Sequence, residues 1–166
     1  ASLGGHHALE RGQVDTRAWW TMTPGACLTA VIARLVAAGL TQALSPLGVR
    51  NQANQVIDQS FSVTPVSVSP SPSPDRSEAN VAGLRVEQVF DIQLGHKVRP
   101  TDGLEAPSTA LGDLHTTLKY LAAGNTSLTQ GTSIRFGPST MSFAGSGAFL
   151  IQSFSFSVTY NLTLVI

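Results

Sequence analysis

Apart from Val165, the residues from Phe154 to Ile166 alternate between apolar and uncharged polar side chains. Alternation with a period of two is typical of a β-strand that buries one of its faces. At roughly 3.4 Å per residue these 13 residues would span about 44 Å, which is well beyond the length of a usual strand. A small domain has little material to cover such a strand, and its polar face carries no charge. We therefore expect a protein that is buried in an assembly rather than an isolated enzyme.

The charge content supports this expectation. Charged residues make up 12% of the 166-residue chain, about half of the roughly 25% typical of soluble domains. The formal net charge is zero, which argues against a protein that holds nucleic acid through its phosphates. The longest apolar stretch, residues 28–40, contains Arg34 and is too short to span a bilayer. The N-terminal residues lack the basic-then-apolar order of a signal peptide, so we expect a soluble chain and no membrane partner.

Two helices are predicted from apolar stripes and their end signals. Thr23 and Pro24 provide a cap and a first helical residue, and Gly39 a stop. Cys27, the only cysteine, lies near this stripe and is predicted to be a packing residue. Ser108 or Thr109 is predicted to cap the second helix, which Gly124 closes. The stripe of the second helix consists of leucines: Leu111, Leu114, Leu118 and Leu121.

Strands fill most of the rest of the chain. An extended segment begins at residues 61–63, and residues 84–94 alternate between apolar and charged side chains. A further strand is predicted at residues 134–136, and a glycine-rich turn at 144–147 leads into the final strand. Between the first two strands a Ser/Pro-rich run favours extended backbone without a core. We interpret residues 65–80 as a projecting loop.

This order of elements predicts an α+β fold, a mainly antiparallel β-sheet flanked by two helices. Residues 1–22 form an N-terminal arm in this interpretation, and residues 23–166 form a single domain. Two adjacent large aromatic residues, Trp19 and Trp20, are predicted to anchor the arm on this subunit or on a neighbour. Other candidate interface residues lie in the loop and on the charged strand face: Ser71, Pro72, Asp75, Arg85, Glu87 and Asp91. Arg85 and Glu87 offer opposite charges that can pair around a ring.

Catalysis would be indicated by a sequence motif or by a cluster of acid and base residues. The chain has no CxxC pair, HExxH, Walker loop or GxGxxG. The acid and base residues that can form a cluster are Asp91, His96, Asp102, Asp113 and His115. We expect them to be solvated or hydrogen-bonded loop residues, and we predict no catalytic, cofactor or metal site. A small hydrolase-like or metal-binding enzyme that uses this region is the alternative from a different class.

The pattern from about Met22 to Ile166 resembles the tail terminator and related neck (head-tail joining) proteins of long-tailed bacteriophages. The matching stretches are TPGACLTAVIARLVAAGL, QSFSVTP, LRVEQVFDIQLGHKV, ALGDLHTTLKYLA and FLIQSFSFSVTYNLTLVI. The resemblance lies in the order of elements: a helix, a β-hairpin with a long loop, a second helix and a terminal β-hairpin. It carries no catalytic residues to this chain.

The resemblance implies a non-enzymatic structural protein of the virion tail or neck, assembled in the host cytoplasm. Its partners would be its own copies in a ring, a hexamer in that family, the tail tube protein, and the head-side connector or head-completion protein. DNA would be only passing cargo, and no cofactor is implied. Another neck, tail-completion or tail-tube protein remains an alternative, and so does a carbohydrate- or peptide-binding β module.

Overall fold

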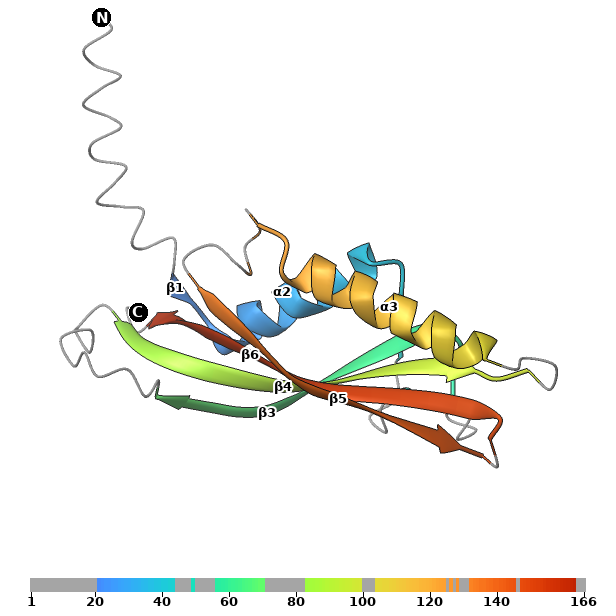
Figure 1. Ribbon diagram of the computed structural model, residues 1–166. Helices are drawn as coiled ribbons and strands as arrows, with labels where there is room; N and C mark the ends of the chain where they lie inside the picture. The colour runs from blue at the N-terminus through green and yellow to red at the C-terminus, as the bar shows by residue number, and fades with distance from the viewer. Residues whose placement is uncertain are drawn as a thin grey trace, which may run out of the picture.

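The computed structural model shows an α+β fold, a mostly antiparallel sheet with two helices packed on one face (Figure 1). This confirms the predicted fold class. The structure describes residues 21–43, 49, 56–70, 83–99, 104–124, 126, 128, 132–145 and 147–163. Statements about structure below refer to these residues. The arm residues Trp19 and Trp20 and the loop residues Ser71, Pro72 and Asp75 lie outside them.

Four long strands build the sheet. They are β3 (Ser60–Pro70), β4 (Gly83–Lys97), β5 (Ser133–Ala144) and β6 (Phe149–Thr163). Two short strands, β1 (Thr21–Met22) and β2 (Thr41–Gln42), join in parallel at β6 and β3. The order is β1-β6-β4-β3-β2, and β5 also pairs with β6. β5 pairs with residues 149–159 of β6 and β1 with residues 161–162, so β6 is bonded along both of its edges.

The alternation of the final strand produces the predicted burial. The even-numbered side chains of β6 from Leu150 to Tyr160 are buried, and they face the helices. The same parity holds in β4, where the even-numbered side chains from Val86 to Leu94 form the neighbouring row of buried residues. The antiparallel register places Phe90 opposite Phe156 at the centre of this core. The period-two pattern therefore fixed both the strand and the face that it buries.

Helix α2 (Pro24–Ala37) begins as predicted. The backbone N–H of Ala26 donates a hydrogen bond to Thr23 Oγ1 (3.2 Å), and Pro24 is the first helical residue. Cys27 is fully buried in the core, as predicted, and burial raises the pKa of its thiol to about 12. Gly39, at φ +91°, follows the end of the helix.

Helix α3 (Glu105–Leu121) begins earlier than predicted. Leu104 stands at its N-cap without a side-chain cap bond, so the assignment of Ser108 or Thr109 as cap was wrong. Pro107 is tolerated in the first turn because the N–H groups there have no acceptor within the helix. Glu105 places a carboxylate at the positive end of the helix. The leucine stripe is also partly wrong, because Leu111 is 56% exposed.

Two predicted boundaries change as well. Thr21 and Met22, assigned to the arm, form strand β1. Residues 65–70, assigned to the projecting loop, belong to β3 and pair with residues 86–90 of β4. Proline is compatible with this position because β3 is an edge strand beyond Phe61, and a register shift between Pro65 and Ser67 absorbs the irregularity. No described helix is long and apolar enough to cross a membrane.

Candidate assembly surface

The sheet has one face without a described helix, which we call the outer face. In Figure 1 both α2 and α3 lie above the sheet, and this face is turned away from them. The odd-numbered residues of β4 and β6 point to it, as the buried even-numbered ones point to the helices. Along β6 they are largely uncharged and hydrogen-bonding: Ser153, Ser155, Ser157, Thr159 and Asn161. Such a face is suited to broad polar contact with another protein surface.

The predicted charged residues of β4 lie on the outer face. Arg85 Nη1 donates to Asn161 Oδ1 (3.3 Å) of the neighbouring strand. Glu87 accepts a hydrogen bond from Arg135 Nη2 at 2.6 Å. Arg135 comes from β5, so this ion pair reaches across β6, which lies between the two strands. Arg85 and Glu87 therefore each have a partner within the subunit, and Arg135 is a member of this surface that the sequence did not reveal.

Asp91 differs from these two residues. Its side chain is exposed on the outer face, where the register places Thr64 of β3 and Ser155 of β6 beside it. Both neighbours are uncharged hydroxyl residues, so Asp91 presents a negative charge on an otherwise neutral part of the face. Of the predicted charged interface residues, it is the one best placed to meet a partner.

The two long edges of the sheet are open over most of their length in the described residues. β2 pairs with β3 only at Ser60 and Phe61, and β5 pairs with β6 alone. Each of these edge strands carries a proline at a register shift, Pro65 in β3 and Pro138 in β5. Prolines and bulges are common devices that block indiscriminate pairing of sheet edges. The edges are thus exposed but protected against unspecific polymerisation.

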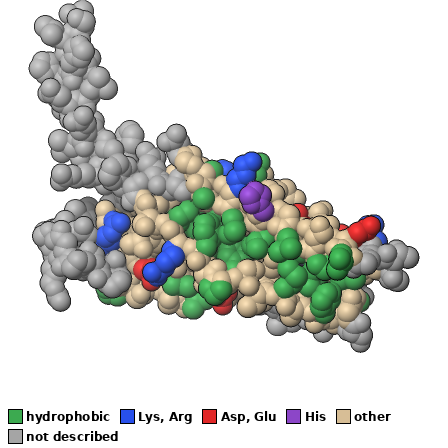
Figure 2. Space-filling view, viewed as in Figure 1, with side chains coloured by type: hydrophobic (Ala, Val, Ile, Leu, Met, Phe, Trp, Pro, Cys, Tyr) green, Lys and Arg blue, Asp and Glu red, His purple; other side chains and the backbone are tan. Residues whose placement is uncertain are grey.

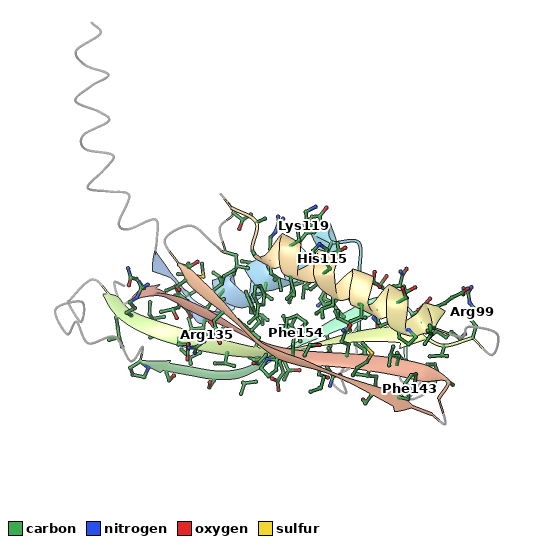
Figure 3. All side chains as sticks on the ribbon, viewed as in Figure 1. Arg99, His115, Lys119, Arg135, Phe143 and Phe154 are labelled. Carbon is green, nitrogen blue, oxygen red and sulfur yellow. The ribbon has the colours of Figure 1, made fainter. Side chains whose placement is uncertain are left out.

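Exposed apolar side chains lie on α3 and on β5 toward the turn end of the β5–β6 hairpin. Two of them come from α3, Leu104 (83% exposed) and Leu111 (56%), and two from β5, Met141 (38%) and Phe143 (59%). Met141 and Phe143 face the helix side, because they pair with the buried Gln152 and Leu150. We call these four residues the α3–β5 strip. Hydrophobic side chains gather over this part of the molecule in Figure 2, and Figure 3 places Phe143 at that end of the hairpin.

The sequence contains a pattern that points to the two β5 residues of this strip, Met141 and Phe143. Residues 140–143 alternate between polar and apolar side chains, which is typical of a strand, whereas the strand expected above covers only residues 134–136. Leu111 was predicted, but as a core residue. Its side of α3 faces away from α2, since Tyr120 on the opposite side contacts Arg34 of α2, with the guanidinium 5.5 Å from the ring centroid.

The acid and base residues do not assemble into one cluster. His96 Nδ1 and Asp113 Oδ2 are 3.4 Å apart beneath α3, whereas Asp91 lies on the outer face and His115 is exposed on α3. Asp102 is outside the described residues. Burial lowers the pKa of His96, against the opposing effect of Asp113 and Asp58. An imidazole that is neutral and almost fully buried is poorly placed to exchange protons with a substrate.

The surroundings of His96 are polar and poorly hydrogen-bonded. Thr117 Oγ1, both side-chain polar atoms of Gln152 and both ring nitrogens of His96 are buried without a hydrogen-bond partner. Gln152 lies diagonally across the β4–β6 pair from His96, and Thr117 lies one helical turn beyond Asp113. A shallow pocket beside them is lined by both charge signs, including Asp58, Lys97, Arg99 and Glu105. The enzyme alternative requires a pocket that unites the cluster, but of its described members, Asp91, His96, Asp113 and His115, only His96 lines this one.

Metal binding gains no support in the described part of the chain, where no group of three or more histidine, cysteine or acidic residues could hold an ion. No protein-family model matches the sequence, and no curated protein matches it.

Proposed function

We propose that the protein is a structural, non-enzymatic subunit that forms a ring and terminates the tail of a long-tailed bacteriophage. One observation carries the proposal: a sheet whose strands β4 and β6 reach 15 residues has helices on only one face. The other face is largely uncharged and polar, and the two long edges are open but protected. Among the described residues outside the sheet, Val49 and Val56 pack against this face beside Gly95, and assembly with copies of the chain would cover more of it.

The ring follows from the asymmetry of these surfaces. The two long edges of the sheet, β3 and β5, differ in sequence and register, and its two ends differ as well, so a contact between one copy and the next, along an edge or end to end, joins different patches. Such heterologous contacts close into rings when the rotation between copies is right. The resemblance of the element order to tail terminators gives this geometry its role: a ring that caps the tail tube, stops its growth and offers a surface to the head-side connector.

Virion assembly without the protein tests the proposal. Particles produced from a genome that lacks this chain should carry tails of uncontrolled length, or tails that fail to join heads, in negative-stain images. Supplying the protein in trans should restore both length and attachment. Tails of normal length on attached heads in its absence would overturn the terminator role.

The purified protein separates the terminator from its nearest alternative. A terminator should form discrete rings of fixed subunit number, whereas a tube protein should polymerise into tubes of variable length. Electron microscopy of the isolated protein distinguishes the two outcomes.

A further inference from the structure

We propose that the α3–β5 strip of each subunit receives Trp19 and Trp20 from the arm of a neighbouring copy. The inference deepens the proposed function, and it depends on that function only through self-association of the chain. It starts from four exposed apolar side chains: Leu104 and Leu111 of α3, and Met141 and Phe143 of β5. Exposed aliphatic and aromatic side chains that gather in one place mark a contact site more often than scattered ones do.

The place where the arm begins excludes docking on Phe143 within one subunit. Thr21 pairs with Asn161 near one end of β6, whereas Phe143 pairs with Leu150 near the other end. The 11 residue steps from position 150 to position 161 (161 − 150 = 11) span about 36 Å at roughly 3.3 Å per step. Trp20 directly precedes Thr21, and two residues of extended chain reach only about 7 Å. The tryptophans of a subunit therefore cannot reach Phe143, the β5 end of the strip, in that same subunit.

The same separation suits contact between copies. Each subunit presents the arm at one end of its sheet and the strip at the other end, so the donor end of one copy meets the acceptor end of the next. Every copy then gives one arm and receives one, as a closed ring requires. Trp19 and Trp20 are adjacent and large, and buried tryptophans are among the strongest contributors to protein interfaces. The strip supplies the apolar and aromatic surface that indole rings pack against.

Self-association of variants tests the contact. The arm variant Trp19→Ala/Trp20→Ala and the strip variant Leu111→Ser/Phe143→Ser should each raise the dissociation constant by about tenfold or more in sedimentation velocity. Both changed strip residues are more than half exposed, so thermal unfolding of the monomer should stay unchanged. Combining the two variants should cost no more than either alone, because both remove the same contact. The matched control is Val36→Ser, at a 52% exposed position on α2, and it should associate normally.

A cross-link tests the geometry while keeping both tryptophans. Ala18→Cys with Met141→Cys should give a ladder of covalent oligomers under mild oxidation, and native Cys27 is buried and does not interfere. Ala18→Cys with Val36→Cys should give none. Absence of the ladder, unchanged association of the arm variant, or fully additive losses would each overturn the inference.

These results are separable from the terminator role. Normal rings from the arm variant, together with uncontrolled tails in particles that lack the protein, would overturn only the arm contact. A ladder from a protein whose absence leaves tails normal would overturn only the terminator.

Discussion

Phe156 lies at the centre of the sheet and has no exposed surface. Its ring centroid is 5.2 Å from that of Phe136 on β5, and Phe90 of β4 lies opposite it in the register. The side chain therefore joins three strands through one apolar contact region. Its removal would therefore disturb the packing of three strands at once.

Replacing Phe156 with alanine should lower the free energy of unfolding by about 3–5 kcal/mol, because it removes a fully buried ring and leaves a cavity. Phe143→Ala is the matched control, since Phe143 is 59% exposed, and it should cost less than about 1 kcal/mol. Chemical denaturation of both variants provides the measurement. Equal losses would mean that the core does not lie where the alternation of β6 places it.

Cys27 and Tyr160 couple stability to alkaline pH. Burial raises the pKa of the Cys27 thiol from 9.0 to about 12. Burial, and secondly Cys27, raise that of the Tyr160 hydroxyl from 10.0 to about 12. Both groups lose their protons earlier in the unfolded chain than in the folded one, so the unfolded state binds fewer protons between pH 9 and pH 12. Stability should therefore fall as pH rises through that range.

Urea titrations across that range measure this effect. The unfolding midpoint of the native protein should decrease steadily from pH 9 upward, and the slope should be smaller in Cys27→Ser. A midpoint that does not respond to pH would show that the thiol and the hydroxyl are open to solvent.

At the scale of elements, the sequence predicted what periodicity controls. The burial of β6 and β4 follows a period of two, and the start of α2 follows from Thr23 and Pro24. The start of α3 was missed, because Leu104 stands at its N-cap and has no side chain that can cap a helix, so no capping residue marks that start in the sequence. The ion pair between Glu87 and Arg135 was also missed, because it joins β4 and β5 across β6 and depends on a register that local sequence does not encode.

That ion pair can be tested by exchanging the charges of its two residues. Arg85 was the expected opposite charge for Glu87, but the structure pairs Glu87 with Arg135. Glu87→Arg should therefore be rescued by Arg135→Glu and not by Arg85→Glu. Arg135 is 72% exposed, so the coupling energy in a double-mutant cycle should be at most about 1 kcal/mol. Rescue by the Arg85 change instead would contradict this register of β5 on β6.

The loop between β3 and β4 gives a second prediction at this scale. Because β3 extends to Pro70, a deletion that starts after Pro70 should leave the fold intact and impair assembly. One that also removes residues 66–70 takes away the part of β3 that pairs with residues 86–89 of β4, and should destabilise the subunit. Circular dichroism with thermal unfolding, and particle counts from assembly reactions, would measure the two effects. Unimpaired assembly of the shorter deletion would rule out a role of the loop in contacts between subunits.

For the whole molecule, the open edges of the sheet decide between ring and aggregate. Pro65 and Pro138 stand at the register shifts of the two edge strands. Pro65→Thr with Pro138→Thr restores an N–H group to each edge and favours edge-to-edge pairing. This variant should form large, heterogeneous species in light scattering. Ser67→Thr with Thr140→Ser, which leaves the prolines in place, should keep the size distribution of the native protein.

The pairing of β6 has a consequence for biosynthesis. β6 contributes the partner for β1, β4 and β5, yet it follows every other described element along the chain. While a ribosome is still producing α3 and β5, only the β3–β4 hairpin and the short β2 have their strand partners. β1 must wait for a residue 140 positions later, since Thr21 pairs with Asn161 (161 − 21 = 140), and such long closures slow folding. A nascent or truncated chain that stops before β6 therefore lacks the finished outer face and the β5–β6 pairing that positions the α3–β5 strip, so it cannot receive the arm of a neighbouring copy.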